Sequence, residues 1–139
     1  MTIKHSVQGF ALIGLIITIV IIGILAAIAV PFFQNSTKRV DYSEVIQATA
    51  PYKVGVEQCY QSLKTLTGCN AGANNIPSAI TIPAGAVNSL TVTNGVISVI
   101  PVAQNGITAD DTYILTPNVV NNALVWSSSG GGVVAGYAK

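Results

Sequence analysis

A continuous apolar run near the N-terminus constrains the fold of this chain more than any other feature. From Phe10 to Phe33 the sequence reads FALIGLIITIVIIGILAAIAVPFF, with no charged side chain. Because roughly 20 helical residues cross the ~30 Å hydrocarbon layer of a bilayer, this run is long enough to span a membrane. The sequence therefore predicts one transmembrane helix, followed by a more polar part that is rich in Asn, Ser, Thr and Gly.

A short polar leader, residues 1–9 (MTIKHSVQG), precedes the apolar run. Lys4 is its one side chain with a certain positive charge, and such charges stay on the cytoplasmic side of a bacterial inner membrane. The C-terminal part is therefore expected in the periplasm. Three schemes fit the leader: an uncleaved anchor, a signal peptide cut at the A-x-A-like Ala27–Ala29, or a cut before the apolar run.

The composition argues against several classes of function. Six Lys and Arg nearly balance five Asp and Glu, so there is no basic field for nucleic-acid binding. The only histidine, His5, lies in the leader, which removes the commonest general base from the rest of the chain. Asp110 and Asp111 are expected in a solvated turn, and the absence of an alternating acidic pattern argues against a calcium loop there. We expect no enzyme activity, no cofactor and no metal site.

The start of the apolar run resembles a known family. Residues 9–15, GFALIGL, followed by IITIVIIGILAAIAVP, resemble the class III leader and N-terminal helix of type IV pilins and type II secretion pseudopilins. In that family a prepilin peptidase cuts between the glycine and the phenylalanine and methylates the new N-terminus. The resemblance implies cleavage after Gly9 and N-methylation of Phe10.

The same resemblance implies that residues 10–33 form the half of the helix through which subunits polymerise. Family members usually carry a glutamate at the fifth position after the cut, which neutralises the N-terminal amine of a neighbouring subunit, whereas this chain has Gly14. Glycine and proline weaken helices, so a kink or local melting is expected between Gly23 and Pro31. The polymerisation residues implied are Phe10, Leu12, Ile13, Gly14, Leu15, Gly23 and Pro31.

Residues 34–63 are predicted to continue the helix in amphipathic form. Apolar side chains recur there at three- and four-residue spacing, as expected for one buried helix face. Lys53 and Glu57 have the spacing of an ion pair on one helix, and Pro51 should bend it. The apolar stripe consists of Val45, Ala48, Tyr52, Val56, Cys59, Tyr60 and Leu63.

Residues 64–139 are predicted to be a loop followed by an antiparallel β head. Cys59 and Cys69 favour a disulfide in an exported domain, with two free buried thiols as the alternative. The dipeptide Asn94-Gly95 between apolar runs is typical of a type I′ hairpin. Strands are expected at residues 90–93, 96–100, 113–116 and 123–127, but not in the Gly-rich tail. The fold class is α+β, with a long N-terminal helix packed on a three- to four-stranded antiparallel sheet, the pilin fold.

The resemblance implies a structural subunit of a type IV pilus that supports adhesion, twitching motility or DNA uptake. It is expected in the inner membrane before assembly and outside the cell afterwards, and nucleic acid would be met only by the assembled pilus. The implied partners are further copies, other pilin subunits, the prepilin peptidase and an inner-membrane assembly platform. Two alternatives remain: a type II secretion pseudopilin, or a membrane-anchored periplasmic binding domain that never polymerises.

Overall fold

The computed structural model describes Thr2–Lys139, with side chains from Gly9 onward. Met1 and the side chain of Lys4, which is expected to orient the leader, lie outside this description. The chain separates into two compact units, Met1–Ser36 and Thr37–Lys139, and each is described by itself. We call the second unit the head.

The first unit is helical and belongs to α1 (Thr2–Ala48), which contains Pro31 inside it. The helix has no break at Gly23 or Pro31, so the predicted local melting of this stretch is wrong for this structure. Proline lacks only one N–H donor, and the turns on either side keep their own hydrogen bonds. An apolar environment also favours the helix, because it satisfies backbone groups within the segment.

In the head, the end of α1 is followed by α2 (Ala50–Leu63), and Thr49 separates the two helices. Pro51 stands in the first turn of α2, where its missing N–H leaves a gap in the helical ladder. Between the helices, both the N–H and the hydroxyl of Thr49 donate to the carbonyl of Ile46, at 3.1 and 2.6 Å. α2 ends at Leu63, as predicted, whereas the bend expected at Pro51 stays a prediction.

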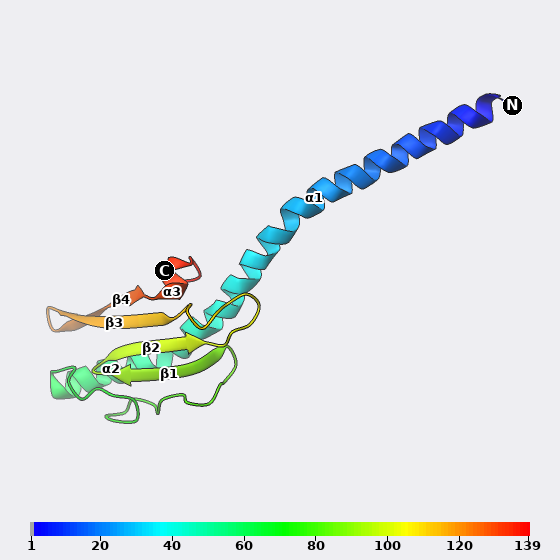
Figure 1. Ribbon diagram of the computed structural model, residues 1–139. Helices are drawn as coiled ribbons and strands as arrows, with labels where there is room; N and C mark the ends of the chain where they lie inside the picture. Colours follow the sequence, from blue (N-terminus) through cyan, green and yellow to red (C-terminus); the bar gives the residue numbers. More distant parts are fainter. Residues whose placement is uncertain (1) are drawn as a thin grey trace. The chain divides into compact units, whose positions relative to one another are not determined.

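Four antiparallel strands follow in the order β1 (Val87–Thr93), β2 (Val96–Pro101), β3 (Tyr113–Val120) and β4 (Ala123–Ser129) (Figure 1). The turn after β1 has positive φ at both Asn94 (49°) and Gly95 (84°), as a type I′ hairpin requires. Asn121 and Asn122 form the turn after β3 in the same way, with φ of 51° and 62°. The prediction of a small antiparallel sheet is confirmed, with four strands.

β3 runs beyond the predicted strand, through Pro117 to Val120. Proline removes one donor from a sheet, so it is tolerated where a neighbouring strand is missing. Pairing between β2 and β3 stops at Leu115, and Pro117 pairs only with Trp126 of β4. The end of β3 is therefore a two-stranded ribbon with β4, and a proline fits there.

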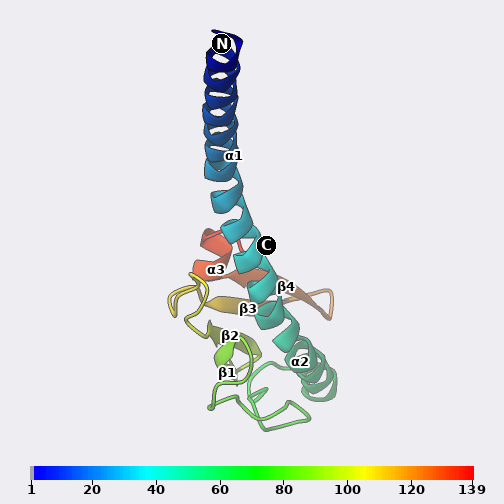
Figure 2. The same cartoon turned by 90° about the vertical axis from the view of Figure 1, so that its right-hand side faces the viewer.

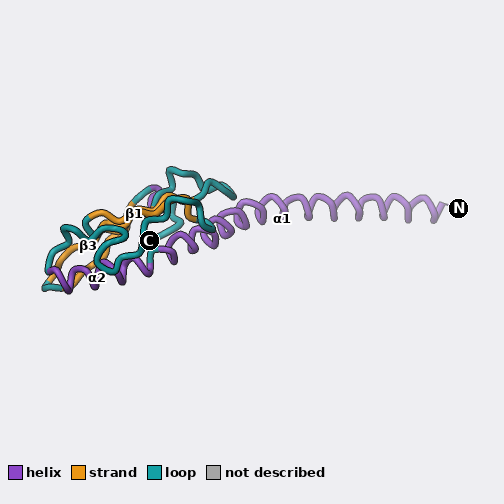
Figure 3. The backbone as a smooth tube through the Cα atoms, turned by 90° about the horizontal axis from the view of Figure 1, so that it is seen from below, coloured by secondary structure: helices purple, strands orange, loops and turns teal. Residues whose placement is uncertain are grey.

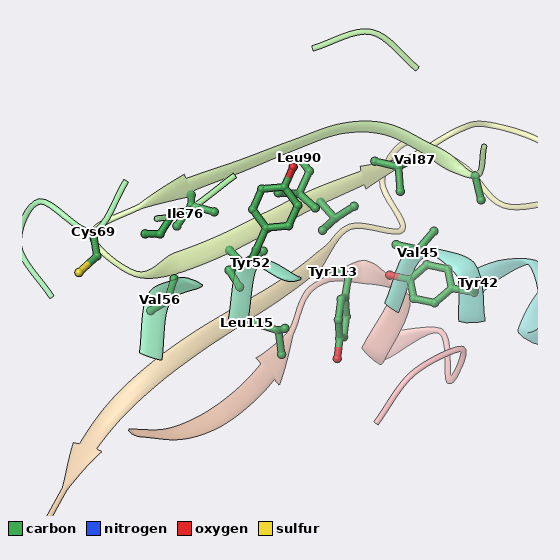
Figure 4. Close-up of a cluster of buried hydrophobic side chains, with 14 of the residues drawn as sticks. Tyr42, Val45, Tyr52, Val56, Cys69, Ile76, Val87, Leu90, Tyr113 and Leu115 are labelled. Carbon is green, nitrogen blue, oxygen red and sulfur yellow. The ribbon is translucent and has the colours of Figure 1, made fainter. Parts of the chain in front are cut away.

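The core of the head lies between the sheet and the helices, which form two layers (Figures 2 and 3). Alternate residues are buried along β2, the first half of β3 and β1 from Leu90 onward, as expected for strands with one covered face, and a bulge early in β1 shifts its pattern. From the helices, the predicted stripe is buried at Val45, Tyr52 and Val56 and exposed at Leu63, at the very end of α2. Figure 4 shows this cluster, with Tyr42, Tyr52 and Tyr113 among its members. The α+β fold is confirmed.

A short helix that the sequence did not predict, α3 (Gly131–Val134), closes the tail onto this core. Gly132 is buried, and a Cβ at this position would overlap the hydroxyl of Tyr42. That hydroxyl donates to the carbonyl of Asp111 at 2.8 Å, while the ring of Tyr42 packs against Tyr137. The Gly-rich tail is therefore ordered by close approach to Tyr42 and not by strand pairing.

Candidate functional site

The apolar surface of the first unit is the largest candidate site. Within the described residues, one helical stretch is long and apolar enough to cross a membrane, and none of its most apolar part is buried in the structure. A signal sequence near the N-terminus meets the same criterion, but the core helix of a soluble protein would be mostly buried. Because this helix is apolar on all sides, it requires lipid or other apolar helices around it.

The exposure of single residues indicates how much free energy would be gained by covering this helix. Phe10 is 82% exposed and Leu12 is 60% exposed, and Ile13 and Leu15 are similarly uncovered. Burying a large aliphatic or aromatic side chain stabilises by about 1.5 to 3 kcal/mol. Summed over this helix, the free energy available from lipid or from neighbouring helices exceeds the usual stability of a small domain, about 5 to 15 kcal/mol.

The predicted cleavage residues Gly9 and Phe10 both lie within α1. A Cβ at Gly9, Gly14 or Gly23 would meet no other atom within 4 Å, so none of these glycines is required by packing within the chain. The carbonyl of Gly14 accepts a hydrogen bond from the hydroxyl of Thr18 at 2.7 Å, which satisfies the only hydroxyl of the apolar run. The structure does not test the roles predicted for these residues.

Beside Pro31 the helix surface carries a shallow apolar notch of about 420 Å³. Ala29 and Val30 line one part of it, and Phe33 and Gln34 line the other. Small residues next to larger ones let apolar helices approach closely. The notch is therefore a place where another apolar helix could pack closely against this one.

The predicted disulfide between Cys59 and Cys69 is present, with the two Cα atoms 5.9 Å apart. Both residues are buried, Cys59 near the end of α2 and Cys69 in the following loop. The carbonyl of Cys69 accepts from the N–H of Gly95, so the bridge ties α2 to the β1–β2 turn as well. The disulfide therefore holds the loop against both layers of the head.

Lys53 and Glu57 do not form the predicted ion pair with one another; within the described residues both contact Trp126 instead. The indole Nε1 donates to Glu57 Oε1 at 3.1 Å, and Lys53 Nζ lies 5.4 Å from the ring centroid. An indole offers a donor at its edge and a negative face, so one ring serves both charges. Local helix spacing could not predict this contact, because Trp126 lies on β4.

Asp111 serves a turn, as expected. Its carboxylate accepts from the N–H of Thr108 at 2.8 Å and from the Thr108 hydroxyl at 3.2 Å. Among the described residues, no group of three or more His, Cys, Asp and Glu side chains lies together as metal ligands would. The geometry of Asp110 and Asp111 gives a calcium loop no support.

Burial raises the pKa of three tyrosines in the core of the head. Desolvation by burial is the largest cause at Tyr42, and the charge of Asp111 and the neighbouring Tyr113 raise its pKa further. Desolvation alone raises the pKa of Tyr52 and of Tyr113. These groups stay neutral at physiological pH, so the core contains no ionised tyrosine that could serve as a base.

Comparisons with known proteins bear on both units. Residues 4–30 match the family model described as the prokaryotic N-terminal methylation motif. The type IV major fimbrial protein FimA of Dichelobacter nodosus is 32% identical over 137 residues, which cover 91% of this chain and 85% of that protein. The match therefore includes the head as well as the apolar helix.

Two further relatives match over a shorter part of the chain. Prepilin peptidase-dependent protein D of Escherichia coli (strain K12) is 37% identical over 91 residues, 66% of this chain and 61% of that protein. The type IV pilus subunit protein TapA of Aeromonas hydrophila is 36% identical over 72 residues, 52% of this chain and 51% of that protein. The chain thus spans about half to three fifths of the length of these two relatives.

Proposed function

Since this chain belongs to the type IV pilin family, we propose that it is a structural subunit of a type IV pilus, assembled through residues 10–33. The observation that carries this proposal is the apolar helix, whose large side chains are more than half exposed. Lipid covers such a helix before assembly, and the helices of neighbouring subunits cover it in a filament. The head needs no such cover, because it has its own core.

The proposed processing is cleavage between Gly9 and Phe10 with methylation of the new N-terminus. It is supported by the match of residues 4–30 to the methylation motif, which includes both residues. The partners that follow are the prepilin peptidase, an inner-membrane assembly platform, further copies of this chain and other pilins. Residues 1–9 are the proposed leader, and the head would face the periplasm before assembly and the exterior of the cell afterwards.

Within this proposal the pilus serves adhesion, twitching motility or DNA uptake. The proposed residues of the polymerisation helix include Leu12, Ile13, Leu15, Gly23 and Pro31, with Gly14 as the departure. A Cβ at Gly14 would meet no neighbouring atom, so a larger side chain could be accommodated there. The absence of a carboxylate at Gly14 leaves the amine of a neighbouring subunit without that partner.

A second candidate function is a pseudopilin of a type II secretion system, which shares the processing step. It is favoured by one relative whose name states only that it depends on prepilin peptidase. A third candidate is a membrane-anchored head that never polymerises. Both place residues 10–33 in the membrane, so they differ from the pilus in assembly and not in insertion.

N-terminal sequencing of the chain purified from its own membranes tests the processing. A terminus at methylated Phe10 is expected, whereas an N-terminus at Met1 or Val30 would contradict cleavage by the prepilin peptidase. Electron microscopy of sheared surface fractions then separates the candidates. Surface filaments that contain the chain are expected, and their absence from a strain with normal amounts of processed protein would favour a pseudopilin or an anchored monomer.

A further inference from the structure

A small hollow lies between α2 and the start of β4, and the proposed assembly through residues 10–33 leaves it unused. Its volume is about 250 Å³. That is the space of about eight water molecules at ~30 Å³ each, and it is smaller than a pocket for a drug-sized ligand, ~300 Å³ or more. Its lining consists of Glu57, Tyr60, Gln61, Asn122, Ala123 and Leu124.

Two regular elements of the head build the hollow. On α2, Glu57 is followed by Tyr60 and Gln61 at three and four residues, so all three share one face of the helix. On the sheet, Asn122 ends the turn with φ of 62°, and Ala123 pairs with Val120 at the start of β4. Because the helix and the hairpin turn fix both walls, the hollow is formed before any ligand arrives.

The one charged side chain of the lining is held in place and electrically balanced. Glu57 Oε1 accepts from Trp126 Nε1 at 3.1 Å, while Oε2 has no hydrogen-bond partner in the part of the chain that the structure describes. Lys53 lies over the ring of the same Trp126. The cluster thus combines one negative and one positive charge, and it creates no net field that would select an ion.

The Tyr60 residue is only 7% exposed, but its hydroxyl is not buried: it has no hydrogen-bond partner among the described residues and stays in contact with solvent at the wall of the hollow. Two other buried tyrosines do have one: Tyr42 donates to the carbonyl of Asp111 at 2.8 Å and Tyr52 to that of Ser78 at 2.7 Å. Because no group of the described chain occupies the Tyr60 hydroxyl, it can exchange a water molecule for a hydroxyl group of a ligand in the hollow.

We infer that this hollow binds one neutral, hydroxyl-rich ring, namely a single sugar residue. Hydroxyl groups both donate and accept hydrogen bonds, which suits a lining of one phenol, one free carboxylate oxygen and the two amides of Gln61 and Asn122. Leu124 gives the C–H groups of such a ring an apolar contact. With few contacts and an open side, the hollow should bind one ring with a Kd on the order of 1 mM.

The test is a titration of the full chain in detergent micelles, followed by NMR. Trp126 is the only tryptophan, so its indole N–H gives one assignable signal beside Glu57. Methyl glucoside, methyl galactoside and N-acetylglucosamine are the probes. At least one of them should shift the Trp126 signal and the side-chain amides of Gln61 and Asn122. Cyclohexanol, of similar size with a single hydroxyl, and ethylammonium, a small cation, should produce no saturable shift.

Two substitutions and one matched control localise the effect. Glu57→Gln keeps an acceptor for Trp126 but removes the charge, and it should weaken binding about tenfold. Asn122→Gly keeps a residue that tolerates positive φ but removes the amide, and it should weaken binding several-fold. Asn121→Gly is the control, because Asn121 also has positive φ but does not line the hollow. It should bind as the unaltered chain does.

Three results would overturn the inference. One is the absence of any shift with all three sugars at concentrations well above the expected Kd. Another is a response to ethylammonium or cyclohexanol as strong as the response to the best sugar, which would mean a cation site or a nonspecific apolar site. The last is equal loss of binding in Asn121→Gly and Asn122→Gly, because the hollow would then not be where the sugar binds.

Discussion

The two units of this chain share helix α1 but differ in whether their apolar side chains are buried within the unit. In the head, apolar residues occupy one stripe of the helix, and the sheet covers them. In the first unit, apolar residues surround the helix, and their large side chains from Phe10 onward are more than half exposed. The comparison teaches that the head is stable by its own contacts, while the first unit depends on its surroundings. Substitutions can test this difference by changing each unit in the same way.

The same truncation in both units should give the largest contrast. Leu90→Ala removes a fully buried side chain of the head and should lower its free energy of unfolding by about 2 to 5 kcal/mol. Leu12→Ala, in the first unit, should leave the unfolding of the head unchanged. Urea denaturation of the full chain in micelles, followed by Trp126 fluorescence, measures both. Equal destabilisation by the two variants would contradict the separation of the units.

An introduced arginine should affect the first unit more than the head, the reverse of the truncation to alanine. Ile21→Arg, near the middle of residues 10–33, should disfavour membrane insertion by about 3 kcal/mol, or about 100-fold. Val54→Arg, at an exposed position of α2, should insert normally. Membrane fractionation after carbonate extraction compares the two variants. Normal insertion of Ile21→Arg would mean that the first unit is not the membrane anchor.

Loss of the disulfide should affect the head alone. Replacing both Cys59 and Cys69 by alanine frees a short loop in the unfolded chain and should cost about 2 to 3 kcal/mol of stability in the chain-entropy model. Membrane insertion should not change. Urea unfolding of this variant and of the reduced unaltered chain should agree. A variant as stable as the oxidised chain would show that the packing of the loop suffices without the bridge.

High pH should destabilise the head through its buried tyrosines. Because burial raises the pKa of Tyr42, Tyr52 and Tyr113 above the value of about 10 in an unfolded chain, the neutral form is favoured in the folded state. The resulting stability is complete below pH ~10 and is lost as pH rises through the folded-state pKa values. Thermal unfolding measured from neutral to alkaline pH should show this decline.

Tyr42→Phe should give the smallest change, about 1 kcal/mol at neutral pH, from the lost hydrogen bond to Asp111. It should also make the alkaline decline less steep, because one titrating group is removed. A decline of unchanged steepness would mean that Tyr42 does not contribute to it.

Local patterns predicted the strands and the hairpin turn at Asn94-Gly95, because alternating apolar residues and turn residues act over a few positions, and the disulfide was expected from two cysteines in an exported domain. They missed α3 and the contacts of Trp126, which depend on residues distant in the sequence. Gly132 is needed only because Tyr42 lies against it, and Trp126 changes the roles of Lys53 and Glu57. The hollow beside α2 escaped prediction for the same reason, since it has one wall from each layer.

The packing of Gly132 on Tyr42 also sets an order of events during biogenesis. Tyr42 leaves the ribosome early, but its hydroxyl and ring are covered by Asp111, Gly132 and Tyr137, all from the last part of the chain. Domains fold as units, and this one cannot close until its C-terminus has emerged. A head translocated N-terminus first would thus remain open and threadable until export is nearly complete, and only a full-length subunit would become compact.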